Sequence, residues 1–127
     1  MPLQQVTPMI HVPDVRATAA WYESIGFAVL NTFEDEDGMT FALLSYGNSQ
    51  IMLNAGGLPA TQDRREVDLY VRTNEVDRLY ERLKDCVQID QGPEETFYGT
   101  REFSVRDLNG FWLTFGQDLD ANAVSPD

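Results

Sequence analysis

Aromatic side chains occur beside acidic ones at two places in this chain of 127 residues. Phe33 and Phe41 flank the acidic run Glu34–Asp37, while Phe97 and Tyr98 follow a segment rich in Gly, Pro and Glu. The face of an aromatic ring attracts positive charge, and a nearby carboxylate supplies a counter-ion. This combination predicts a site that binds a planar cation by stacking. The alternative is that the rings only pack strands together, and for Phe41 the sequence does not favour either interpretation.

The residues typical of nucleophilic or acid–base catalysis are scarce. His11 is the only histidine and Cys86 the only cysteine. His11 could titrate near neutrality, so it either lines a pocket or takes part in catalysis or metal binding. We expect Cys86 to be a small apolar residue, buried or half-buried, after the second helix, because no base adjoins it in the sequence. The sequence contains no nucleophile elbow, phosphate-binding glycine loop or Cys-x-x-Cys pair.

The charge balance limits the class of partner. The chain has 21 acidic and 9 basic residues, a formal net charge of −12, which repels nucleic acids and anionic membranes and attracts small cations. The acids could equally serve only to keep the surface solvated. With 43% hydrophobic residues, no bilayer-spanning run and no signal peptide at the N-terminus, the sequence predicts a cytoplasmic globular protein.

The chain consists of two successive blocks with the same order of predicted elements. The first block, residues 5–54, begins with a strand, continues with a helix capped by Asp14 and ended by Gly26, and closes with three strands. Turns are expected at Asp37-Gly38 and Gly47-Asn48. The expected strands are Val6–Val12, Phe27–Phe33, Met39–Tyr46 and Gln50–Asn54.

The second block, residues 66–117, follows a linker over 55–65 and precedes a polar tail over 118–127. We expect a strand over Glu66–Arg72, a helix capped by Thr73 or Asn74, a short strand over Val87–Ile89 and a loop over Gln91–Thr96. The block then closes with a hairpin whose tight turn is Asn109-Gly110, capped by Asp107. The whole chain is long enough for one domain with a core but too short for two independent domains.

Three segments resemble the glyoxalase/bleomycin resistance/dioxygenase superfamily, also called the vicinal oxygen chelate (VOC) superfamily. They are Val12–Val15, the WYESIGF stretch Trp21–Phe27, and the pattern R-E-F-x-x-x-D-x-x-G over Arg101–Gly110. The resemblance covers residues 5–117 and is closest to the bleomycin-resistance members, which bind a drug without transforming it. Where that family has Asp-Pro-Asp-Gly, this chain has Leu108 and Asn109 as the two middle residues, which preserves the turn.

This resemblance implies an α+β fold of two βαβββ modules, each a curved mixed sheet with its helix on the convex face. The concave face is then available for a ligand. It also implies a homodimer, because one module of this size does not enclose a cavity and the site is built from modules of both chains.

Strand alternation assigns side chains to the two faces of these sheets. The residues expected against the helices are Pro8, Ile10, Val12, Ile51, Leu53, Val67, Leu69, Val71, Phe111, Leu113 and Phe115. For Arg101 and Glu102, an ion pair or a turn-fixing hydrogen bond is the alternative to ligand contact. The predicted ligand-binding residues are His11, Phe33, Phe41, Met52, Asn54, Glu66, Asp68, Tyr70, Phe97, Tyr98, Arg101, Glu102 and Trp112.

In catalytic members of the superfamily, four strand positions hold a divalent ion. The resemblance places these positions at Thr7, near Met52, at Glu66 and at Thr114, and only Glu66 is a usual metal ligand. A chain with one histidine also lacks the two histidines of a facial triad. We therefore expect no metal and no other cofactor.

These observations favour a dimeric, metal-free binding protein that sequesters a planar cationic drug of the bleomycin type. The alternative is a metal-dependent enzyme of the same superfamily, either a glyoxalase-like lyase or an extradiol-type dioxygenase. A structural or protein-interaction module is a third interpretation, which the varied and aromatic residues of the expected cavity disfavour.

Overall fold

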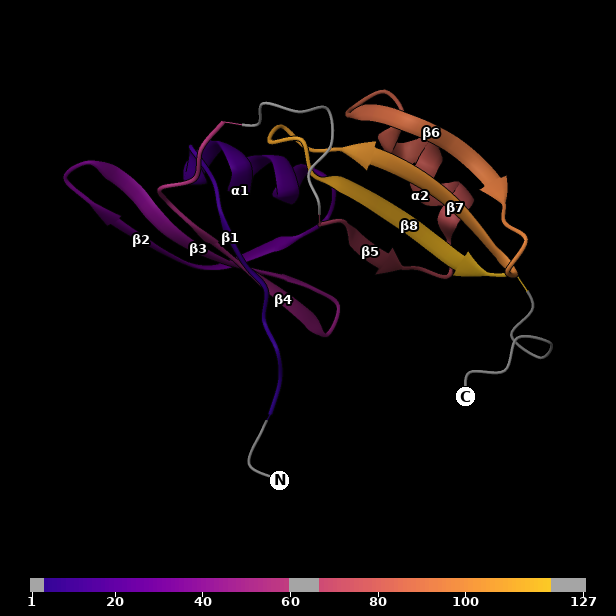
Figure 1. The fold of residues 1–127 in the computed structure, drawn as a ribbon, viewed down its shortest axis with the longest axis horizontal. Coiled ribbons are helices and arrows are strands. Elements are labelled where there is room, and N and C mark those ends of the chain that lie inside the picture. The colour runs from indigo at the N-terminus through magenta and orange to yellow at the C-terminus, as the bar shows by residue number, and fades with distance from the viewer. Residues whose placement is uncertain (1–3, 60–66, 120–127) are drawn as a thin grey trace. The chain divides into compact units, whose positions relative to one another are not determined.

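The computed structural model of the protein describes residues 4–59 and 67–119. The chain forms two compact units, residues 1–61 and residues 62–127, and each contains one four-stranded mixed sheet and one helix. Figure 1 shows the same arrangement of strands and helix in both units. The predicted α+β fold of two βαβββ modules is therefore confirmed.

In the first unit, sheet A has the strand order β1-β4-β3-β2, with β1 parallel to β4 and the other pairs antiparallel. Asp14 caps α1 as predicted, because its Oδ1 accepts a hydrogen bond of 2.9 Å from the backbone N–H of Ala17. The first strand is shorter than the expected Val6–Val12. The elements are β1 (Met9–His11), α1 (Val15–Ser24), β2 (Ala28–Asp35), β3 (Gly38–Tyr46) and β4 (Ser49–Asn54).

Helix α1 covers one face of sheet A. The alternating residues Ala42 and Leu44 of β3 and Ile51 and Leu53 of β4 are buried, as are the helix residues that face them. This alternation confirms the assignment of Ile51 and Leu53 to the core. Pro8 was expected there as well, but its side chain is exposed just before β1 begins, although its carbonyl accepts from the N–H of Met52 at 2.8 Å.

In the second unit, sheet B has the strand order β5-β8-β7-β6, with β5 parallel to β8. Figure 1 shows β6, β7 and β8 curving past α2. Phe103 and Phe115 stack against each other with ring centroids 5.0 Å apart and form the centre of this core. The elements are β5 (Leu69–Arg72), α2 (Val76–Leu83), β6 (Gln88–Glu95), β7 (Thr100–Arg106) and β8 (Trp112–Asp118).

The loop predicted over Gln91–Thr96 is wrong, because most of this segment belongs to β6. Its Gly92 and Pro93 are unfavourable inside a sheet, but β6 is an edge strand of sheet B, where a missing N–H is tolerated. The register of β6 with β7 shifts between Ile89 and Gln91 and again before Glu94, so the strand accommodates these residues in irregular pairing.

The N-terminus of α2 is capped differently from the prediction. The N-cap residue is Glu75, and the backbone N–H of Val76 donates 2.9 Å to Oε1 of Gln117 on β8. The hydroxyl of Thr73 accepts from the N–H of Glu75 instead of capping the helix. A side chain from the sheet therefore supplies the cap.

The β7–β8 connection is a five-residue loop, Asp107–Phe111, rather than a tight two-residue turn. The predicted capping role of Asp107 is confirmed, because its Oδ1 accepts from the N–H of Asn109 at 2.7 Å and that of Phe111 at 2.9 Å. Gly110 has a φ of 85°, which favours glycine at this position.

Two further burial predictions in the second unit are wrong. Val67 is 61% exposed, because it lies two residues before β5 begins and so is not part of the sheet. Cys86 is exposed in the segment that follows α2.

The described part of the chain contains no helix that is long and apolar enough to cross a bilayer.

Candidate functional site

We use the term open face for the side of each sheet that lies away from its helix. On the open face of sheet A, four predicted site residues form one row across the strands. His11 pairs with Asn54, Asn54 with Phe41, and Phe41 with Phe33. The fold thus brings together residues that are far apart in the sequence.

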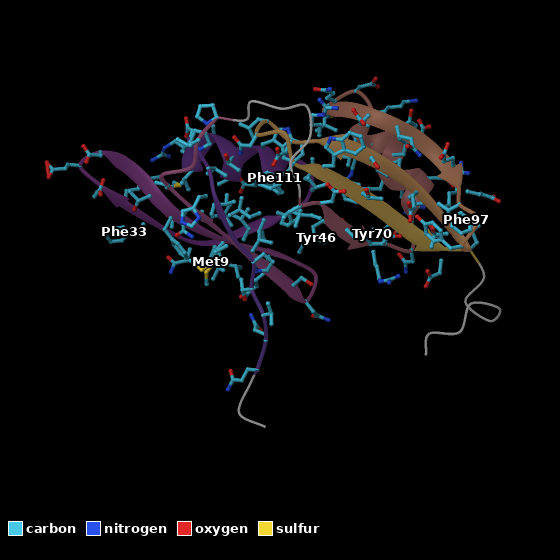
Figure 2. The ribbon with its side chains drawn as sticks, in the orientation of Figure 1. Met9, Phe33, Tyr46, Tyr70, Phe97 and Phe111 are labelled. Atoms are coloured by element: carbon cyan, nitrogen blue, oxygen red, sulfur yellow. The ribbon has the colours of Figure 1, made fainter. Side chains whose placement is uncertain are left out.

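A second row lies beside the first on the same open face. It places Met52 next to Met9 on one side and next to Leu43 on the other. Figure 2 shows Met9 and Phe33 on the side of sheet A away from α1. Phe33 is 61% exposed, so its ring is accessible for stacking. The side-chain N–H2 of Asn54 is inaccessible to solvent and donates no hydrogen bond to any residue within 4–59 or 67–119.

Two carboxylates of the acidic run beside Phe33 already have partners within the first unit. Glu34 forms an ion pair of 2.5 Å with Arg16 of α1, and Oδ1 of Asp35 accepts from the N–H of Asp37 at 2.8 Å. Both groups of the Arg16–Glu34 pair are largely exposed, so solvent screens their charges.

The open face of sheet B is polar. Tyr70, Thr114 and Ser104 form one row, and Arg72, Gly116 and Glu102 form the next. The side chains of β8, the strand between β5 and β7, alternate between the two faces as predicted. Leu113 and Phe115 are buried towards α2, while Trp112 and Thr114 are half-buried on the open face.

Glu102 is the centre of a hydrogen-bonded cluster on this open face. Its Oε2 accepts from the hydroxyl of Tyr70 at 2.8 Å and from that of Thr100 at 3.0 Å. The hydroxyl of Tyr98 lies 3.0 Å from both Oε1 and Oε2. We refer to Glu102, Tyr70, Tyr98 and Thr100 as the Glu102 cluster. Although Glu102 points away from α2, it is only 9% exposed.

Gly116 makes this geometry possible. A Cβ at that position would lie 1.9 Å from Oη of Tyr70 and 2.5 Å from Cζ of the same ring. The tyrosine therefore crosses directly over the glycine on β8 to reach Glu102 on β7. Any larger residue at position 116 would displace Tyr70 from the carboxylate.

Burial and the Glu102 carboxylate together disfavour ionisation of the two tyrosines. Burial, followed by the hydrogen bond to Glu102 and its negative charge, raises the pKa of Tyr70 to about 12. The hydrogen bond to Glu102 is also the main cause that raises the pKa of Tyr98 above its usual value. Both hydroxyls are therefore protonated donors at neutral pH.

At the other end of the open face of sheet B, Arg106 lies over Trp112. The guanidinium carbon is 5.4 Å from the ring centroid, and Nη2 of the same arginine donates 2.8 Å to Asp90 on β6. A cation of the protein thus already contacts the Trp112 ring. This gives Trp112 a structural role, in addition to its predicted position on the open face.

Phe97 and Arg101 differ from the residues of the Glu102 cluster in their position. Phe97, labelled in Figure 2, lies in the turn between β6 and β7 and is 99% exposed. Its ring makes an edge-to-face contact with that of Tyr98. Arg101 points to the helix side, where its Nε donates 2.9 Å to Asp77 of α2. For Arg101, the alternative of an ion pair is therefore confirmed, and Glu102 makes hydrogen bonds beside the β6–β7 turn. Asp68 is exposed just before β5, and Glu66 lies outside the described residues.

Three residues of this region were not among the predicted site residues: Thr96, Thr100 and Gly116. The hydroxyls of Thr96 and Thr100 form a hydrogen bond of 2.7 Å, and the hydroxyl of Thr100 also donates to Oε2 of Glu102. Sequence signals could have identified two of them, Thr100 and Gly116. Thr100 is two residues before Glu102, hence on the same face of a strand, and an isolated glycine in a strand indicates close approach of another group.

The resemblance assigns the metal-binding positions of catalytic members to Thr7, Met52, Glu66 and Thr114, and the one usual metal ligand among them, Glu66, lies outside the described residues. On sheet A, Met52 pairs with Met9, and on sheet B, Thr114 pairs with Tyr70. Thioethers and neutral hydroxyls are poor ligands for the divalent ions of this superfamily. Within 4–59 and 67–119, no three His, Cys, Asp or Glu side chains come together as a candidate metal site.

A sequence model described as the Glyoxalase/Bleomycin resistance protein/Dioxygenase superfamily matches residues 4–115. A search of curated protein sequences gave no match.

Solved structures share the fold over nearly the whole chain. A bleomycin resistance determinant encoded on the transposon Tn5 aligns with 91% of this chain and 98% of its own, at 24% identity and a TM-score of 0.70. A bleomycin-binding protein in complex with bleomycin aligns with 91% and 99%, at 22% identity and a TM-score of 0.69. The fosfomycin resistance protein FosX from Listeria monocytogenes aligns with 92% and 94%, at 16% identity and a TM-score of 0.72. At these identities, the likeness shows a common fold.

Proposed function

The chain belongs to the Glyoxalase/Bleomycin resistance protein/Dioxygenase superfamily, and from this membership we propose that it sequesters a planar, cationic small molecule of the bleomycin type. The ligand is bound and released unchanged. We propose ligand-contacting residues on the open face of each sheet, taken separately, and in the β6–β7 turn. These residues are His11, Phe33, Phe41, Met52, Asn54, Tyr70, Phe97, Tyr98 and Glu102.

The observation that carries this proposal is the paired, accessible aromatic surface of sheet A. Phe33 and Phe41 face each other across β2 and β3 on the open face, and Phe33 is mostly exposed. A ring that contributed only to packing would be buried, as Phe27 is against Tyr22 of α1. The exposed Phe33 beside the half-buried Phe41 instead offers a surface on which a planar ligand stacks.

Two further facts support a cationic ligand. The net charge of −12 attracts cations and raises their rate of association. A bleomycin-binding protein with this fold has been solved with bleomycin bound.

We further propose that the protein acts as a homodimer. Met9, Phe33 and Val67 are each more than half exposed in the single chain. Large exposed apolar side chains of this kind commonly mark an interface or a binding groove. Sedimentation equilibrium tests this part, with a dimer expected and a monomer at all concentrations as the contrary result.

Calorimetric titration with metal-free bleomycin, followed by mass spectrometry of the recovered drug, tests the proposed function. We expect saturable binding, recovery of the drug with unchanged mass, and weaker binding by the F33A variant. Absence of binding, or a chemically altered drug, would contradict sequestration. Turnover that depends on an added divalent ion would favour the lyase or dioxygenase alternative.

A further inference from the structure

We propose that the Glu102 carboxylate is the anionic anchor of the site and that it selects a ligand group carrying both positive charge and N–H donors. Amidinium, guanidinium and primary ammonium groups meet this description. The inference rests on the proposed function, because it identifies the residue and the ligand chemistry that give that site its preference for cations.

The first argument is that the Glu102 carboxylate is buried and forms no ion pair with any residue of 4–59 or 67–119. Its side chain is 9% exposed, and every hydrogen bond it receives from the described residues comes from a neutral hydroxyl. Arg72, the arginine nearest in register, lies over the Tyr70 ring at 5.6 Å and pairs with Asp118 at 3.6 Å. Buried carboxylates are normally paired with a positive charge, so this one is poised to receive a positive charge from a ligand.

The second argument concerns the lone pairs of the carboxylate. Oε2 accepts from both Tyr70 and Thr100, whereas among the described residues Oε1 accepts from Tyr98 alone, whose hydroxyl it shares with Oε2. A carboxylate has about four acceptor sites. Oε1 therefore retains the capacity to accept an N–H, and a cationic donor would form a charge-assisted hydrogen bond there.

The third argument is that the donors around Glu102 also form an aromatic rim. Tyr70 is 47% exposed and Tyr98 is 55% exposed, while their hydroxyls converge on the carboxylate. A planar cation approaching the open face would meet ring surface and carboxylate together, which strengthens binding of the cation by both groups. Phe97 extends this aromatic surface beside Tyr98.

The acidic run Glu34–Asp37 is a weaker candidate for the same role. Glu34 is paired with Arg16, and Asp35 is occupied by the hairpin turn. Glu34 is also half exposed, so water and salt screen its charge far more than that of Glu102. The structure therefore directs the inference to Glu102.

Three small probes separate charge from hydrogen-bond donation. Benzamidine is a planar cation with N–H donors, benzamide is its neutral isostere, and phenyltrimethylammonium is an aromatic cation without N–H donors. Each is titrated by NMR into the full-length protein and into the variants E102Q and E94Q. Glu94 is the matched control, because it faces Glu102 in register on β6 but is exposed and lies outside the Glu102 cluster.

We expect the wild type to bind benzamidine at least about tenfold more tightly than either other probe, as a charge-assisted hydrogen bond implies. E102Q should lose that preference, and E94Q should keep it. Equal binding of benzamidine and benzamide, no binding of benzamidine to the wild type, or equal effects of E102Q and E94Q would each overturn the inference.

A measurement on the wild type covers the case in which E102Q does not fold. The side-chain carboxyl carbon signal of Glu102 should shift on addition of benzamidine and stay in place with benzamide. An unmoved signal with benzamidine would contradict the anchor.

The results distinguish failure of the proposed function from failure of this inference. If bleomycin binds but Glu102 does not respond to benzamidine, sequestration stands and the anchor is wrong. If benzamidine binds through Glu102 but bleomycin does not bind, the anchor stands and the bleomycin-type ligand is wrong.

Discussion

The open faces of the two sheets have the same strand architecture but opposite chemistry. Sheet A runs β1-β4-β3-β2 and sheet B runs β5-β8-β7-β6, so each strand of one has a counterpart in the other. In corresponding positions, sheet A carries Met9 and Met52 side by side, whereas sheet B carries Tyr70 and Thr114. One face offers thioethers and phenyl rings, and the other offers hydroxyls around a carboxylate.

This difference shows which part of each module determines the fold and which part is available for function. The helix-facing layers are alike, with Leu53 in sheet A and Leu113 in sheet B both fully buried. The open faces take no part in these helix contacts, so their residues are free to specialise while the fold is retained. Sheet A thus has an apolar open face that suits stacking, and sheet B has a polar open face that suits hydrogen bonding.

The largest expected effect separates the two faces of sheet A. L53A removes a fully buried side chain and should lower the free energy of unfolding by about 2–5 kcal/mol. F33A, on the exposed open face, should change it by no more than about 0.5 kcal/mol. Urea denaturation of both variants measures this. A cost for F33A as large as that for L53A would mean that the open face is a second core.

The next effect concerns the crossing of Tyr70 over Gly116. G116A places a methyl group 1.9 Å from the Tyr70 hydroxyl and should push it off Glu102, at a cost of about 1–3 kcal/mol for a buried carboxylate that loses a donor. G92A is the control in the same sheet, because a methyl there meets nothing closer than the Tyr80 hydroxyl at 3.9 Å. Equal stability of the two variants would argue against the close approach.

A smaller effect is expected for removal of one hydroxyl from the Glu102 cluster. Y70F deletes one donor to the carboxylate and should cost about 1 kcal/mol in urea denaturation, because the neighbouring hydroxyls of Thr100 and Tyr98 remain. Y80F is the control, since the Tyr80 hydroxyl makes no hydrogen bond with any residue that the structure describes. A neutral result for Y70F would show that Tyr70 contributes ring surface alone.

The smallest effect appears only in alkali. The pKa of Tyr70 is about 12 in the folded protein against 10.0 for an unperturbed tyrosine, so the folded state favours the protonated hydroxyl. The stability from this shift is complete below pH 10 and is lost as the pH rises towards 12. The absorbance change of tyrosinate should resolve a late-titrating group in the wild type that titrates earlier in E102Q. Identical titration curves would contradict the hydrogen bond.

The sequence predicted the helix-facing layers well because they follow strict rules. A period of two residues identified Leu53, Leu113 and Phe115 as buried, and these assignments are confirmed. The errors fall where strands end or lie at an edge. Val67 precedes its strand, and Pro93 is tolerated only because β6 is an edge strand, which depends on the whole sheet order.

The Glu102 cluster could be predicted only in part. Tyr70, Tyr98 and Glu102 were expected near a ligand, but their convergence depends on the parallel register of β5 with β8. Tyr70 and Glu102 are 32 residues apart, and neither periodicity nor composition specifies this register. The role of Gly116 likewise becomes apparent only when the ring above it is placed.

The most direct test of the account is an NMR titration of the full-length protein with metal-free bleomycin, read from side-chain methyl and aromatic signals. The account predicts saturable shifts of the Met9 and Met52 methyl groups and of the Phe33, Tyr70 and Tyr98 rings, all on the open faces or their rim. The Ile51 and Leu53 methyl groups, which face α1 from the same strand as Met52, should stay unchanged. Shifts confined to the helix-facing residues, or no saturable shift at all, would contradict a binding site on the open faces.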